Sequence, residues 1–300
     1  MTGASRGIGK ASAVELARRG YDVAVTARTV ADGEGRDHSG TVKQVDDSPL
    51  PGSLAATVDE IERAGGAALA VPADLLDRAS LGAAVATVLE RWGRVDVVVH
   101  SGRYVGPGDM DRFLDTPIDT IERQIEANVV APLVIDKLVI PGMIERGWGM
   151  IVDITSAAGY ADPTTAADGY GLGYGMGYGV SKGGFHRVAG FLDVELRDQG
   201  IYSFNVHPGL VRIERIAQLM ADMGFDDVGA SPEVIAAVVG WLATSDEAPA
   251  LSGTTIEAQY FCHQRGLMPG WGGPTFNDNH IAYDQSGAVL ARYEAALPRP

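Results

Sequence analysis

Tyr178 and Lys182 are the residues of this chain best suited to move a proton. They are four positions apart, so in a helix they lie on one face, one above the other. A free phenol loses its proton near pH 10, and bringing that value to about 7 requires roughly 4 kcal/mol of preferential stabilisation of the phenolate. An ammonium about 4 Å away supplies on the order of 4 kcal/mol at an effective dielectric constant near 20. The pair can therefore serve as a general acid and base near neutral pH.

Two other tyrosines, Tyr170 and Tyr174, precede Tyr178 at the same interval, but only Tyr178 has a lysine four residues later. An isolated tyrosine and lysine at this spacing on an exposed helix are usually structural. The catalytic interpretation therefore depends on the motifs that accompany the pair.

A glycine-rich turn of the form G-x-x-x-G-x-G occupies the start of the chain, with Gly3, Gly7 and Gly9. Without a Cβ the backbone can turn sharply and approach phosphate oxygens closely. Its N–H groups and the positive end of the following helix then face the negative charge. The turn predicts a pyrophosphate site of a dinucleotide, although glycines at this spacing also occur in ordinary turns and helix ends.

Short apolar segments alternate with amphipathic ones, which is typical of a parallel sheet covered by helices on both faces. We expect strands at residues 21–27, 67–73, 95–101, 150–155, 201–207 and 254–258. We expect helices at residues 10–19, 54–64, 78–92, 118–146, 178–198 and 232–243. A dinucleotide turn normally follows a strand, and only Met1 and Thr2 precede Gly3. The first strand is therefore expected to be truncated, with unpaired backbone groups on its neighbours.

The order of the motifs resembles that of the short-chain dehydrogenase/reductase family. The resemblance covers about residues 1–260 and rests on the turn at residues 2–9, the Asp74 segment, Asn128, Ser156, Tyr178-x-x-x-Lys182 and Pro208-Gly209. It implies an α/β fold, a Rossmann-type doubly wound parallel sheet in a single domain. It also implies an NAD(P)-dependent oxidoreductase that interconverts a secondary alcohol and a ketone or aldehyde by hydride transfer.

The resemblance implies a role for each of four catalytic candidates. Tyr178 is the acid and base, and Lys182 activates it and binds the nicotinamide ribose. Ser156 holds the substrate oxygen, with Thr155 beside it as a rival. Asn128 belongs to a water relay that returns protons to Lys182, or else bonds to backbone at a local bend.

The cofactor is expected to be NADP(H), with NAD(H) possible. Ala27 stands where an NAD site usually places an acid, and Arg28 and Arg6 are cations suited to a 2′-phosphate. Asp74 resembles the family residue that contacts the adenine, or else it caps a loop or a helix. The expected cofactor-binding residues are Gly3, Ser5, Arg6, Gly7, Ile8, Gly9, Arg28, Asp74, Leu75, Ser101, Gly102, Tyr178, Lys182, Pro208, Gly209 and Val211.

Several segments depart from the family pattern. His100-Ser101-Gly102-Arg103 replaces the usual Asn-Asn-Ala-Gly, and Arg103 either binds an acidic substrate or, as we expect, turns to solvent. We expect a catalytic domain at residues 1–265 and a C-terminal extension at 266–300 that ends in a helix at 287–297. Within the domain we expect two insertions. The one near 32–52 is a surface excursion, and the one near 159–177 is either a surface loop or a mobile substrate flap.

The composition excludes several classes of binding partner. A formal net charge of −15 argues against nucleic acid or an acidic membrane. Cys262 is the single cysteine and is expected to be an inert packed residue. No apolar run is expected to be long enough to span a bilayer, and no cluster of residues suggests a metal.

We therefore expect a cytoplasmic enzyme that acts on a small molecule. The segments 118–146 and 178–198 resemble the family's subunit-pairing helices, which implies a homodimer or homotetramer. The alternative is a dinucleotide-binding sensor or scaffold without turnover. The sequence does not identify the substrate or the direction of reaction.

Overall fold

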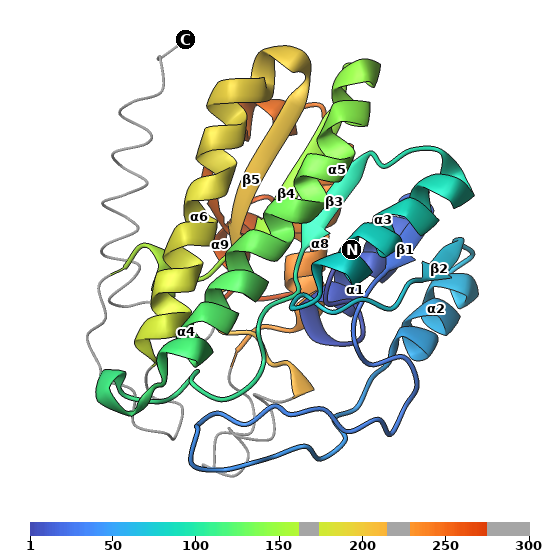
Figure 1. Ribbon diagram of the computed structural model, residues 1–300. Coiled ribbons are helices and arrows are strands. Elements are labelled where there is room, and N and C mark those ends of the chain that lie inside the picture. The colour runs from blue at the N-terminus through green and yellow to red at the C-terminus, as the bar shows by residue number, and fades with distance from the viewer. Residues whose placement is uncertain (162–173, 215–228, 275–300) are drawn as a thin grey trace.

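The computed structural model describes residues 1–161, 174–214 and 229–274, and parallel strands form the centre of this part (Figure 1). β3 (Val97–His100), β4 (Gly149–Ile154), β5 (Ile201–His207) and β6 (Thr255–Glu257) pair in that order. β1 (Val23–Val25) and β2 (Ala68–Ala70) form a second parallel ladder. The strands lie at the positions expected from the apolar segments, and most are shorter at one or both ends.

Met1 and Thr2 lie between the two ladders. Thr2 pairs in parallel with both Thr26 and His100. The Thr2 N–H donates to the Val99 carbonyl at 3.0 Å, and the Thr26 N–H donates to the Met1 carbonyl at 3.0 Å. These two residues of the expected first strand thus bridge β1 and β3 at their carboxyl ends. They place the glycine-rich turn at the carboxyl edge of the sheet, where folds of this kind bind ligands.

Helices cover both faces of the sheet (Figure 1). On one face α1 (Gly7–Arg18), α2 (Leu54–Arg63), α8 (Pro232–Thr244) and α9 (Ala258–Gln264) share an apolar core with the strands. On the other face lie α3 (Arg78–Trp92), α5 (Ala131–Arg146) and α6 (Met176–Leu196). The doubly wound arrangement follows from strands that are apolar on both sides.

The expected helix at 118–146 contains an irregular turn that the apolar pattern did not reveal. α4 (Ile118–Ile125) and α5 are joined by a π-helical turn, η2 (Glu126–Val130), with Asn128 inside it. The Asn128 Oδ1 accepts from the Tyr104 N–H at 2.6 Å, and its Nδ2 donates to Ser181 Oγ at 2.9 Å. Asn128 therefore connects the loop after β3 to α6. It bonds to a backbone N–H at an irregular turn of the helix, which is the alternative to a water relay that the sequence left open.

This continuous helix corrects one expectation. Ile118–Arg146 is long and apolar enough to cross a membrane by length and composition, so the expectation that no run has that length is wrong. Half of its most apolar window is buried inside the fold, because residues such as Ile135, Val139 and Met143 pack in the core. Core helices of globular domains have the same properties, and the helix carries no conclusion about a membrane.

Two helix starts differ from the sequence expectation. α1 begins at Gly7 and not at residue 10, and α6 begins at Met176, two residues before Tyr178. Gly177 lies inside α6, and a Cβ at this position would overlap the Gln124 side chain of α4. Residues 162–173 of the expected flap and the expected helix at 287–297 lie outside the described residues.

Candidate active site

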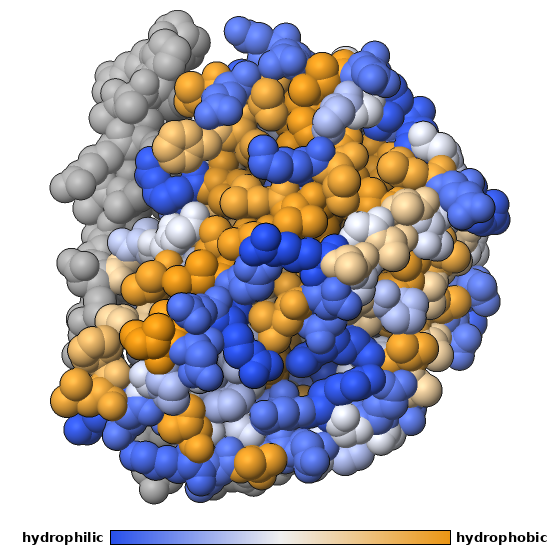
Figure 2. Space-filling view, viewed as in Figure 1, coloured by the Kyte–Doolittle hydropathy of each residue, from blue (hydrophilic) through white to orange (hydrophobic). Residues whose placement is uncertain are grey.

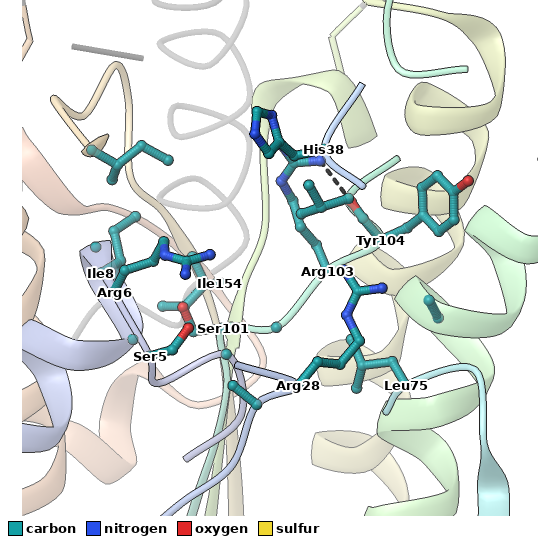
Figure 3. A pocket seen from close by; sticks show the side chains of 18 of the residues that line it. Ser5, Arg6, Ile8, Arg28, His38, Leu75, Ser101, Arg103, Tyr104 and Ile154 are labelled. Atoms are coloured by element: carbon teal, nitrogen blue, oxygen red, sulfur yellow. Dashed lines mark hydrogen bonds between the residues drawn. The ribbon is translucent and has the colours of Figure 1, made fainter. Parts of the chain in front are cut away.

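A cavity of about 360 Å³ lies at the carboxyl ends of β1, β3, β4 and β5 (Figure 3). Every expected cofactor-binding residue lines it, and Ser156 lines it as well. Asn128 does not line the cavity, whereas its neighbour Ala127 does. The fold therefore brings together residues that are up to 208 positions apart in the sequence, from Gly3 to Val211.

The glycine-rich turn has the geometry that its residue types predict. Gly3 and Gly7 have φ values of +64° and +54°, which favour glycine. A Cβ at Gly9 would overlap the Gly3 carbonyl. The Gly7 N–H, at the start of α1, donates to the carboxylate of Glu214 at 3.3 Å. The start of this helix therefore already holds an anionic group, and its backbone donor set fits a pyrophosphate.

Lys182 is buried on α6 beneath the cavity, with 4% of its surface exposed. Its Nζ donates to the Ile154 carbonyl at 3.0 Å. Burial, together with the nearby charge of Arg103, lowers the pKa of Lys182 to about 7. Tyr178 lies half-buried one turn earlier and lines the same cavity.

Ser156 and Thr155, the rival hydroxyls, both line the cavity after β4. The Ser156 Oγ accepts from the Ala158 N–H at 3.2 Å and so caps the short helix η3 (Ala157–Gly159). Its own hydroxyl proton remains available for a substrate oxygen. Thr155 Oγ1 is buried and has no hydrogen-bond partner in the described part of the chain.

The two cations expected at the 2′-phosphate differ in their surroundings. The Arg6 guanidinium donates to the carbonyls of Pro51 and Gly52, each at 2.9 Å. No hydrogen bond from the Arg28 side chain is present among the described residues. Figure 3 shows the two arginines entering the cavity from different sides. Arg28 is therefore the cation that is available to a ligand.

The segment 32–52 is more than the surface excursion expected from its polar composition. Glu34, Arg36, Asp37 and His38 line the cavity, as do Ser48 and Leu50. The Arg6 contacts hold the end of the segment against the turn. These residues were not expected from the sequence, in which the one signal for them is that the segment closely follows Arg28.

Arg103 does not turn to solvent, so that expectation is wrong. Its Nη1 donates to the Tyr104 carbonyl and to Asp109 Oδ2, both at 2.7 Å, and the first of these bonds is drawn in Figure 3. The guanidinium carbon lies 5.5 Å from the ring centroid of Tyr178. Asp109 is buried and attracts the cation inward.

His100 lies in the sheet and does not line the cavity, unlike the three residues that follow it. Its Nε2 bonds to Asp136 at 2.8 Å, and Asp153 pairs with it in the β-ladder. All three residues are at most 2% exposed. Burial raises the pKa of Asp153 to about 8, although the charge of His100 opposes that rise. A buried polar cluster therefore replaces the asparagine that the family usually has there.

A second polar cluster lies beside Pro208-Gly209. The His207 Nδ1 bonds to Glu257 at 2.5 Å, and the Tyr160 hydroxyl donates to the other carboxylate oxygen of Glu257 at 2.6 Å. His207 lines the cavity with 4% of its surface exposed. These bonds fix the turn after β5 to the segment after η3.

The described residues contain no group of three or more His, Cys, Asp or Glu side chains that could hold a metal ion. Cys262 is buried, and burial raises the pKa of its thiol.

Comparison with known proteins agrees with this geometry. Residues 48–223 match the family model of short chain dehydrogenases. Cyclohexanol dehydrogenase from Rhodococcus sp. (strain TK6) is 30% identical over 85% of this chain and 92% of that enzyme. Dehydrogenase/reductase SDR family member 7 from Mus musculus is 29% identical over 71% of this chain, which spans 54% of that longer protein.

A solved structure of a metagenomic short-chain oxidoreductase in complex with NADP is also similar. It has a TM-score of 0.64 and 27% sequence identity, and the match covers 85% of this chain and 93% of that one. This chain belongs to the short-chain dehydrogenase/reductase family of oxidoreductases.

Proposed function

We propose that the protein is an NADP(H)-dependent oxidoreductase that interconverts a secondary alcohol and a ketone or aldehyde. The observation that carries the proposal is that Tyr178, Lys182 and Ser156 line the same cavity as the glycine-rich turn. The similarity to a cyclohexanol dehydrogenase and to an NADP complex supports the substrate class and the cofactor. When bound, the nicotinamide accepts or supplies the hydride.

In this proposal each residue has one task. The Ser156 hydroxyl donates to the substrate oxygen, and Tyr178 takes the proton from that oxygen or returns it. Lys182 lies one turn further along α6 and stabilises the phenolate, and its Nζ would also hold the ribose hydroxyls of a bound cofactor. Asn128 takes part in proton return. It bonds to Ser181, the neighbour of Lys182, and it accepts from the Tyr104 N–H in the loop after β3.

The proposal is tested by titrating the protein with NADPH and NADP⁺, and then measuring turnover on a panel of neutral secondary alcohols and ketones that includes cyclohexanol. We expect cofactor binding and turnover on members of the panel. Cofactor binding with no turnover on any compound would instead support a sensor or scaffold.

Arg28 is expected to determine cofactor preference. Arg28→Asp should weaken NADPH binding by roughly 10- to 100-fold, because a charge-assisted hydrogen bond contributes about 1.5–3 kcal/mol. NADH binding should change little or improve, since the carboxylate suits a ribose hydroxyl. Fluorescence titration with both cofactors at two salt concentrations measures the effect, and salt should weaken the parent preference.

Arg36→Ala is the matched control, since Arg36 also lines the cavity but is already paired with Glu34 at 2.6 Å. It should change the preference much less than Arg28→Asp. Equal affinities of the parent protein for NADPH and NADH would rule out the assignment of Arg28.

We also propose that the protein forms a homodimer or homotetramer through α4, α5 and α6. Large apolar side chains are exposed on α5 and α6, among them Leu138, Val180, Phe191 and Val194. Figure 2 shows apolar surface gathered over α5 and its neighbours on this face. Contiguous apolar surface of this kind usually marks an interface.

Light scattering across micromolar concentrations should give a mass of at least twice 31.5 kDa. Val194→Glu should lower that mass, because Val194 is 85% exposed in the single chain and a charge would be buried in the assembly. A monomeric mass for the parent protein would exclude the interface.

A further inference from the structure

Arg103 is placed to act on the proposed proton carrier. The residue follows β3 and belongs to the segment in which the family pattern usually has glycine. Its guanidinium carbon lies 5.5 Å from the Tyr178 ring centroid, and 28% of its side chain is exposed. The bonds to the Tyr104 carbonyl and to Asp109 fix this position. Asp109 is in turn held by Gln124 Nε2 at 3.1 Å.

The titratable and charged groups around Tyr178 come from several elements. Lys182 lies on α6, and Tyr174 lies just before α6 with its ring centroid 5.7 Å from that of Tyr178. Arg103 and Asp109 lie in the loop after β3. Asp153 on β4 acts indirectly, because its charge raises the pKa of Lys182. Lys182 has a pKa of about 7, because burial and the charge of Arg103 lower it. A lysine with this pKa is only partly charged near neutral pH.

Arg103 retains its charge under the same conditions. Burial by itself lowers the pKa of Arg103, but the Asp109 carboxylate and the Tyr178 phenol outweigh burial and raise it. Arg103 is thus a permanent cation on the ring, whereas Lys182 is a titrating one. Asp109 offsets part of the Arg103 charge, so the two residues together set how much positive charge Tyr178 experiences.

We propose that Arg103 is a positioning residue that stabilises the phenolate of Tyr178, and that Asp109 limits the strength of this effect. The proposal deepens the proposed function, because it assigns regulation of the same acid and base. It differs from an anchor for an acidic substrate, since the effect requires no charge on the substrate.

The experiment measures ionisation of Tyr178 directly in the NADP⁺ complex. The ultraviolet phenolate signal is recorded against pH for each protein and for the same protein carrying Tyr178→Phe, and the difference isolates one phenol. Arg103→Met should move the midpoint upward by about one pH unit, because a neighbouring charge shifts such midpoints by about 1–3 units. Arg103→Lys should restore at least half of the difference, and Asp109→Asn should move the midpoint downward.

Opposite shifts in Arg103→Met and Asp109→Asn are the result that a merely structural role would not produce. The double variant Arg103→Met/Asp109→Asn removes both the cation and the carboxylate that offsets it, and its midpoint should still lie above that of the parent protein. It replaces Arg103→Met if that protein does not fold. An unchanged midpoint in a variant that still binds NADP⁺, or shifts of the same sign, would overturn the proposal.

The pH dependence of turnover on a neutral secondary alcohol provides a second measurement. In each variant the midpoint of this pH profile should shift in the same direction as the midpoint of the optical titration, with little change in KM. An increase in KM for anionic substrates alone, with no optical shift, would show that Arg103 is an anchor and contradict the proposal. Because the optical measurement needs no turnover, its outcome is independent of whether the proposed reaction is correct.

Discussion

Tyr178→Phe is expected to lower turnover by roughly 100- to 10,000-fold, the loss typical of removing a general acid or base. The substitution removes only a hydroxyl, so the ring remains in contact with Arg103 and Tyr174. NADPH affinity and the melting temperature should therefore stay near those of the parent protein. Steady-state rates on the best substrate of the panel, with a fluorescence titration of NADPH, measure both parts of the prediction.

Tyr174→Phe is the internal control. Tyr174 precedes Tyr178 by one helical turn in spacing, has no lysine partner, and does not line the cavity. The control variant keeps the ring contact and should stay active. If Tyr178→Phe reduces the same carbonyl compound at nearly the parent rate, Tyr178 is not the proton carrier.

Lys182→Met should damage both turnover and cofactor binding. Methionine preserves most of the apolar stem, so the buried site is filled, but the ammonium that donates to Ile154 is lost. We expect turnover to fall by about 1,000-fold and NADPH affinity by about tenfold, because the ammonium serves both the phenolate and the ribose.

Lys43→Met is a suitable comparison, since the Lys43 side chain is 68% exposed and pairs only at the surface with Asp115. Its removal should change neither quantity by more than about twofold, as surface ion pairs contribute little. Loss of turnover in Lys182→Met with unchanged NADPH affinity would exclude the role at the ribose.

The sequence predicted the positions of the strands and of the glycine-rich turn. It also indicated residues that the fold places around one cavity, and the roles of those residues stay predictions. Gly3, Gly7 and Gly9 have the spacing of a dinucleotide turn, and parallel strands bring their carboxyl ends to one edge of the sheet whatever the loops do. The residues after β1, β3, β4 and β5 therefore had to meet, and the cavity contains them.

What could not be predicted depends on contacts between distant segments. Arg103 points inward because Asp109 is buried beside it, and no local pattern reveals that burial. The irregular turn at Asn128 forms because Tyr104 and Ser181 offer partners from two other elements. The sequence by itself indicates that Lys182 is fully protonated near neutral pH. Its pKa is lower in the folded chain because the side chain is buried, and the depth of burial cannot be read from the sequence.

The contact between the Gly7 N–H and Glu214 has a consequence for the thermodynamics of cofactor binding. If a pyrophosphate oxygen accepts a hydrogen bond from the Gly7 N–H, it displaces the Glu214 carboxylate from a donor that already has a partner. The free energy of binding is then the difference between two anions at one helix terminus, and it is smaller than the full attraction of that terminus for phosphate. Association would then be an exchange reaction, in which the Gly7 N–H releases the Glu214 carboxylate when the cofactor binds.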